Sequence, residues 1–331
     1  MGIPMGEFDL IRRYFTRPTP RAVLGVGDDC ALLQPRPGMQ LAISSDMLVE
    51  GRHFLSTVSP AALGHKALAV NLSDLAACGA QPLAFTLALA LPRADAAWLE
   101  PFSQGLLALA DAHGCELVGG DTTQGPLNIC ITVFGEVPPG QALLRSGAQA
   151  GDDLYVSGTL GDARLALEVF RGTLSLPEAV FAQARARLET PTPRMALGLA
   201  LRGIATAAAD VSDGLLGDLG HILRASGVAA VIDTSIAMQL IAAGADTLCA
   251  DGRFDVKKIL ACVLAGGDDY ELVFTAPVAA RQAVQAAAAQ AQTRVTRIGQ
   301  IEAASGAPAV RLVDAAGAPV LRQFASFDHF A

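Results

Sequence analysis

The sequence predicts a mixed α/β protein built from two domains, and three observations support this. The chain has 331 residues, of which 52% are hydrophobic and 17% charged, which is more than one core normally holds. Strand-like and helix-like segments alternate in both halves. A Pro-Pro-Gly break at 138–140 leads into a loop that lasts to Gly151. We therefore expect domains at 1–145 and 146–331.

The first domain opens with an amphipathic segment that predicts a short helix. Ser59 with Pro60 predicts a helix start, and Gly79 and Gly114 predict helix ends. Strands are expected where apolar residues run together or alternate with polar ones. In chain order the expected elements are a helix at 7–15, strands at 41–44 and 83–91, helices at 59–78 and 94–113, and strands at 116–118 and 128–137.

The second domain repeats the alternation. Proline at 191 and 193 interrupts the helical segments, and short apolar runs mark the strands. The expected elements are a strand at 154–157, a helix after Gly161, an apolar run at 207–209, a helix ending near Ser226, strands at 229–233 and 271–275, and an Ala-rich helix at 278–291.

Charge and cysteine usage narrow the functional classes. The net charge is −8, which argues against nucleic acid as a partner, because a phosphate backbone requires clustered Lys and Arg. The 6 Cys form no C-x-x-C pair, which predicts free thiols in a reducing cytoplasm. The start of the chain lacks the apolar core of a signal peptide, and the apolar run at 82–92 is too short to span a bilayer.

One pattern recurs: an apolar run ends in Gly or Ser, and Asp follows at once. Glycine lets the backbone approach a ligand, and carboxylates gathered at strand ends favour Mg²⁺ and phosphate. Gly-Asp is also an ordinary turn, and Asp is a common N-cap, so a single copy favours a structural role, whereas five copies make a metal and phosphate site equally compatible with the sequence. The copies lie at 25–29, 44–46, 119–121, 210–213 and 266–269.

The sequence contains no phosphate-binding P-loop, since Lys occurs only at 66, 257 and 258 and never in a Gly-rich loop. If phosphate binds, metal ions and Arg must supply the positive charge. Arg145 is the best-placed cation, because its planar guanidinium suits phosphate oxygens, although a single Arg considered by itself favours a solvated surface role.

Read together and in order, these segments resemble the thiamine-monophosphate kinase family. The resemblance covers nearly the whole chain. It rests on GEFDLIRRYF at 6–15, GVGDDCALL at 25–33, SSDMLVEGRHF at 44–54, KALAVNLSDLAACGA at 66–80, GGDTT at 119–123, RSGA at 145–148, DVSDGL at 210–215, GGDDYEL at 266–272 and DHF at 328–330.

The resemblance implies an architecture like that of aminoimidazole ribonucleotide synthetase, in a homodimer whose N-terminal halves pair their sheets. It implies direct in-line transfer of phosphate from ATP to thiamine monophosphate with several Mg²⁺ ions and no phosphoenzyme. It implies metal ligands at Asp29, Ser44, Ser45, Asp46, Asp74, Asp121, Asp210 and Asp213, ATP contacts at Gly120, Asp121, Arg145 and Ser212, and thiamine phosphate contacts at His53, Asp268, Phe324 and Phe327.

Two positions depart from the family pattern. Asp268 stands where the family commonly has Glu, and Phe324 where it often has Trp. Two other functions compete with the kinase. One is a related ATP-dependent synthetase acting on a purine precursor. The other is a calcium-binding protein, against which the sequence argues because it contains no EF-hand loop.

Overall fold

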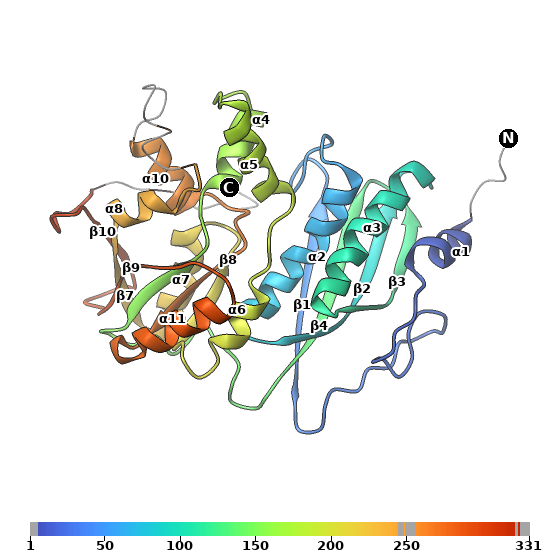
Figure 1. The fold of residues 1–331 in the computed structure, drawn as a ribbon, viewed down its shortest axis with the longest axis horizontal. Coiled ribbons are helices and arrows are strands. Elements are labelled where there is room, and N and C mark those ends of the chain that lie inside the picture. The colour runs from blue at the N-terminus through green and yellow to red at the C-terminus, as the bar shows by residue number, and fades with distance from the viewer. Residues whose placement is uncertain (1–5, 244–247, 249–255, 322–323, 325–331) are drawn as a thin grey trace. The chain divides into compact units, whose positions relative to one another are not determined.

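The computed structural model describes residues 6–243, 248, 256–321 and 324. Two compact units make up the chain. The first comprises residues 1–75 and 80–140, and the second residues 76–79 and 141–331 (Figure 1).

The first unit is a four-stranded sheet with two long helices on one face (Figure 1). The strand order is β1-β4-β2-β3, in which β2 and β3 run parallel and the other pairs antiparallel. α3 forms the crossover between the parallel pair, as such a connection requires. The bounds are β1 Gln40–Val49, β2 Gln81–Leu91, β3 Glu116–Gln124, β4 Asn128–Val137, α2 Pro60–Ala77 and α3 Ala96–His113, preceded by α1 Glu7–Leu10 and a π-helical turn Ile11–Phe15.

Two glycines allow α2 and α3 to approach closely. A Cβ atom added at Gly64 would lie 2.1 Å from the carbonyl oxygen of Phe102, and one added at Gly105 would lie 2.0 Å from that of Ala61. At these two glycines the backbones of α2 and α3 are therefore in direct contact. α3 begins at the N-cap Asp95, whose side chain accepts a hydrogen bond from the Ala97 N–H.

The second unit is a six-stranded sheet of order β10-β7-β9-β5-β8-β6. All neighbours are antiparallel except β10 with β7. Every residue of β5, β6 and β8 is buried. The strands are β5 Asp153–Ser157, β6 Ala207–Val211, β7 Val228–Asp233, β8 Glu271–Ala276, β9 Val295–Ala303 and β10 Val310–Val313.

Helices surround this sheet, and α10 packs against α4 and α7. They are α4 Asp162–Phe170, α5 Glu178–Glu189, α6 Met195–Ala200, α7 Leu215–Ser226, α8 Thr234–Ala237, α10 Val256–Ala265 and α11 Arg281–Gln290, with 3₁₀ turns Met238–Leu240 and Val278–Ala280. The helix expected to start at Val278 thus opens with a 3₁₀ turn before α11.

Two predicted strand ends were wrong. Ser44, Ser45 and Asp46 lie inside β1, which continues to Val49 because each residue pairs with β4. Gly120 and Asp121 likewise lie inside β3, paired with Leu87 and Ala88 of β2. Backbone pairing in the sheet therefore outweighs the turn preference of Gly-Gly-Asp. Among the residues described, none of the helices combines the length and apolarity needed to cross a bilayer.

Candidate functional site

Polar side chains link β1 to α2 in the first unit. The Ser44 hydroxyl donates to the Asp74 carboxylate. The amide oxygen of Asn71 accepts the Asp46 N–H at 3.0 Å, and the Asn71 amide nitrogen donates to the carbonyl of Ala67. The helical spacing of Asn71 and Asp74 therefore presents both to β1. Two predicted metal ligands, Ser44 and Asp74, are in direct contact.

Strand alternation separates the neighbouring residues of β1. Ser44 and Asp46 are half-buried on the face that α2 covers, whereas Ser45 is exposed on the other face. The Ser45 hydroxyl donates to the Ile131 carbonyl at 3.1 Å and lies 3.0 Å from the Thr132 hydroxyl. The structure thus does not bring the Ser45 hydroxyl to the Ser44–Asp74 pair.

Asp121 is exposed on β3, at the opposite edge of the sheet from β1. Three strand spacings separate these edges, so the backbones of β1 and β3 lie about 14 Å apart across the sheet. Gly120 before it has φ 146°, and a Cβ there would lie 1.9 Å from the Leu87 carbonyl oxygen. Only glycine fits this position.

The other predicted residues of this unit lie on loops. Asp29 is exposed, and its N–H donates to the Asp28 carboxylate. His53 Nδ1 accepts the Val49 N–H at 3.0 Å, which leaves Nε2 as the ring donor. Lys66, only 2% exposed, donates to the His53 carbonyl at 3.2 Å. A buried lysine thus supports the turn that carries His53.

Two motif loops of the second unit meet at one end of its sheet. β6 leads into Ser212, and β8 begins just after Asp268, since antiparallel pairing places Val211 opposite Glu271. The Asp268 N–H donates to the Ser212 carbonyl at 2.8 Å. Asp268 itself has φ 67°, an uncommon left-handed conformation held by these contacts.

Asp218, in the first turn of α7, holds the first of these loops. Its Oδ2 accepts the N–H groups of Ser212, Asp213 and Gly214, each at 3.1 Å. Burial, followed by the nearby Asp213 carboxylate, raises the pKa of Asp218 to about 7, while the three N–H donors oppose the shift. Asp218 is not among the site residues predicted from the sequence. An Asp in the first turn of the helix that follows the loop was the signal available.

Asp210 and Arg145 differ in solvent exposure. Asp210 is buried within β6, whereas Arg145 is exposed. Arg145 lowers the pKa of His221 after burial does, and Asp213 opposes this shift, so both charged groups lie close to His221. Arg145, a predicted phosphate contact, and Asp213, a predicted metal ligand, are therefore both near His221 of α7.

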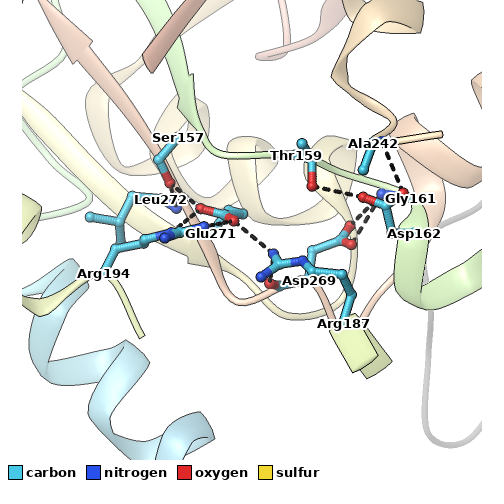
Figure 2. Close-up of polar contacts among 10 residues, drawn as sticks. All are labelled: Ser157, Thr159, Gly161, Asp162, Arg187, Arg194, Ala242, Asp269, Glu271 and Leu272. Carbon is cyan, nitrogen blue, oxygen red and sulfur yellow. Dashed lines mark hydrogen bonds and ion pairs between the residues drawn. The ribbon is translucent and has the colours of Figure 1, made fainter. Parts of the chain in front are cut away.

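A buried ionic cluster, absent from the sequence prediction, fixes the second loop (Figure 2). Glu271 is fully buried and accepts hydrogen bonds from Arg187 at 2.7 Å, from Arg194 at 2.6 and 2.5 Å, and from Ser157 at 2.6 Å. Arg187 also donates to the carbonyl of Asp269 at 3.1 Å. The pairs are widely separated in sequence, so no local pattern marks them.

Asp269 is a second buried acid of the cluster (Figure 2). Both its oxygens lie 3.0 Å from the Gly161 nitrogen. Burial raises its pKa well above the usual value, as burial also raises that of Asp162, which accepts from Thr159 and Ala242. Asp269 thus ties the loop before α4 to the loop before β8, and Asp162 ties the start of α4 to Ala242.

Phe324 packs half-buried against the core of the second unit and lines a pocket of about 400 Å³. The pocket also contains Glu168 and Arg164, which form an ion pair at 2.8 Å. Its volume lies within the range of small-molecule sites. Phe327 and the terminal motif at 328–330 lie outside the described residues.

Within the part of the chain that the structure describes, no group of three or more His, Cys, Asp or Glu side chains is arranged to hold a metal ion. The predicted ligands come as pairs or single residues, so each unit by itself holds only part of the set. All of them are carboxylate or hydroxyl oxygens. This donor chemistry fits Mg²⁺, which keeps several waters and binds one or two carboxylates together with phosphate.

Comparison with known proteins identifies the family. Residues 27–137 match the AIR synthase related protein N-terminal domain, and residues 149–310 match the C-terminal domain. The thiamine-monophosphate kinase of Salmonella typhimurium is 46% identical over 331 residues, 98% of each chain.

Two solved structures share the fold. That of thiamine-monophosphate kinase from Stenotrophomonas maltophilia K279a is 45% identical, with a TM-score of 0.80 over 91% of this chain and 93% of that one. The structure of AaThiL complexed with AMPPCP and TMP is 30% identical, with a TM-score of 0.74 over 90% and 89%. The chain, with its two AIR synthase related domains, therefore belongs to the thiamine-monophosphate kinase family.

Proposed function

We propose that this protein is a kinase that transfers the γ-phosphoryl group of ATP to thiamine monophosphate, giving ADP and thiamine diphosphate. The observation that carries this proposal is the identity of 46% and 44% to thiamine-monophosphate kinases over 98% of the chain. The neighbour solved with AMPPCP and TMP supports the substrate pair. The bond between the γ-phosphorus and the β,γ-bridging oxygen breaks, and an oxygen of the thiamine phosphate forms the new bond.

The protein's task in such a transfer is mainly to align and to stabilise. The attacking phosphate oxygen is already anionic at neutral pH, so no strong base is needed. Arg145 supplies one positive charge, and Gly120 is exposed on β3, where the close approach of the Leu87 carbonyl requires glycine. Aligned binding supplies much of the rate enhancement.

Magnesium ions are the proposed cofactor, held by Asp29, Ser44, Ser45, Asp46, Asp74, Asp121, Asp210 and Asp213. When bound, they neutralise charge on the phosphates during transfer. Ser44 supports the role of Asp74, because its hydroxyl already orients that carboxylate. Ser45, whose hydroxyl faces the other side of β1, takes part through its backbone oxygen.

Thiamine monophosphate carries a cationic thiazolium, a flat pyrimidine and a phosphate. Phe324 offers a ring face in a pocket that also holds the Glu168 carboxylate, which suits the organic part. His53, with Nε2 as the ring donor, and Asp268 are the proposed contacts to the phosphate end and the ring. Phe327 remains a second candidate for stacking.

We also propose a homodimer that forms through β1. This edge strand of ten residues exposes large apolar side chains on one face, with Leu41 at 47%, Ile43 at 61% and Met47 at 52% exposure. Such a strand favours pairing with another sheet. Light scattering after gel filtration should give a dimer for the wild type and for the control Val278→Lys, but a monomer for Ile43→Lys. A dimeric Ile43→Lys would reject this interface.

Five described cysteines are free thiols, which supports the reducing cytoplasm as the compartment.

The decisive experiment is chromatographic separation of the products formed from ATP with thiamine monophosphate, and in parallel with a formylglycinamidine ribonucleotide. Thiamine diphosphate should form and the purine product should not. Asp74→Asn and Asp121→Asn should each lower turnover at least about 100-fold, the size expected when charge stabilisation is removed. Asp111→Asn on α3, an exposed control, should retain the wild-type rate. Wild-type rates in both site variants would contradict the metal assignment.

A further inference from the structure

We propose that Asp218 is a positioning residue. By accepting the backbone N–H groups of residues 212–214, it makes the loop bind cations through oxygen atoms and prevents it from binding phosphate through N–H groups. The inference rests on the proposed function and adds a residue to its nucleotide site. Asp218 is 4% exposed, and its single oxygen Oδ2 collects three consecutive backbone N–H groups at 3.1 Å.

Those three N–H groups are the ones that would otherwise bind an anion. A Gly-containing loop that leads into a helix normally directs its free N–H groups toward phosphate. Here the loop precedes the twelve-residue helix α7, and an internal carboxylate already occupies the donors. The loop therefore has no backbone N–H left at 212–214 to offer a nucleotide phosphate.

The same arrangement decides which groups the loop presents. The Ser212 carbonyl accepts the Asp268 N–H, so this loop is also fixed from the β8 side. Gly214 has φ 113°, and a Cβ there would lie 2.9 Å from the Ala265 backbone, so the turn has little freedom. With its N–H groups directed inward, the loop's remaining chemistry is oxygen: the Asp213 carboxylate and the Ser212 hydroxyl. Oxygen donors suit a divalent cation that accompanies the nucleotide.

The predicted signature is the dependence of nucleotide affinity on magnesium. Calorimetric titration with AMPPCP gives one Kd without Mg²⁺ and one with Mg²⁺. The quantity compared is the Kd without Mg²⁺ divided by the Kd with Mg²⁺. Asp218→Ala removes the contact that holds the N–H groups inward, so the loop can turn these groups toward phosphate, while cation binding should weaken. The ratio should fall at least about tenfold, since the loss of one charge-assisted hydrogen bond alone corresponds to roughly that factor. A purely structural defect would weaken both titrations alike and leave the ratio unchanged.

Two further variants separate the hydrogen-bonding effect of Asp218 from the effect of its charge and from the general effect of losing a buried carboxylate. Asp218→Asn keeps an oxygen acceptor without the charge and should restore most of the ratio. Asp152→Ala removes another buried carboxylate of the same unit, one that accepts from Gln149 at 2.9 Å and Thr206 at 2.6 Å. This control should lose stability and keep the wild-type ratio.

Hydrogen exchange gives a readout independent of ligand. The amides of 212–214 should exchange at least about tenfold faster in Asp218→Ala and at the wild-type rate in Asp152→Ala. If the Ala variant does not fold, Asp218→Ser takes its place in both measurements. An unchanged Kd ratio, unchanged amide exchange, or equal ratios for the Asn and Ala variants would overturn the proposal. Failure of the proposed function is seen separately, as a wild-type protein that forms no thiamine diphosphate.

Discussion

The buried Glu271 cluster allows one stability effect to be worked out in detail. Glu271→Gln keeps the side-chain volume but removes the negative charge shared by Arg187 and Arg194, whose side chains are only 16% and 18% exposed. Glutamine offers one oxygen where the carboxylate uses two, so its amide group must face an arginine N–H. Two largely buried cations then lose the carboxylate that they share.

Breaking a buried ion pair in this way costs about 3–5 kcal/mol of unfolding free energy. For a domain of 150–250 residues, each kcal/mol shifts the melting temperature by about 2–4 °C, so Glu271→Gln should melt roughly 6–20 °C below the wild type. Urea unfolding followed by circular dichroism should show a lower midpoint with an unchanged slope.

The control is Glu302→Gln, which breaks the exposed ion pair with Arg311 at 2.7 Å. Because both groups are about half-exposed, the loss should stay below about 1 kcal/mol. The reasoning about burial would be refuted if Glu271→Gln unfolded within 1 kcal/mol of the wild type, or if the two variants were equally destabilised.

Two further changes test packing and pH dependence. Gly64→Ala places a methyl group 2.1 Å from a backbone oxygen and should lower the free energy of unfolding by about 1–3 kcal/mol. The control Gly306→Ala has open space around it and should leave stability nearly unchanged. Equal melting curves for the two variants would contradict the close helix crossing. The Asp153 pKa is lowered chiefly by hydrogen bonds from Arg281, and further by Arg297, so its stabilisation is present above its unfolded pKa and is lost as pH falls through the lower folded value. Wild type should therefore exceed Asp153→Asn by about 1.5–3 kcal/mol at pH 7, and the gap should close as the pH is lowered below about 4; a gap independent of pH would argue against an ionic origin.

Local signals in the sequence determined most of the secondary structure. Ser59 with Pro60 and the glycines at 79 and 114 mark the ends of α2 and α3 as observed. Alternation marked β4 to the residue. These signals act over one or two turns of chain, so they can be recognised without knowing the fold. The order of the Asp-containing motifs along the chain likewise indicated the family.

Tertiary structure decided what each motif residue faces. Pairing with β4 placed Ser44 and Ser45 on opposite faces of one strand, which no local pattern reveals. The buried partners of Glu271 lie 77 to 114 residues away in the chain. The sequence predicted a functional role for the loop before β8, but it did not predict the side chains that hold this loop in place. Asp218 differs, because it is close in sequence to the loop it holds, yet only its burial and its three N–H contacts distinguish it from an ordinary turn residue. Burial and long-range pairing are properties of the whole fold, so a short stretch of sequence does not encode them.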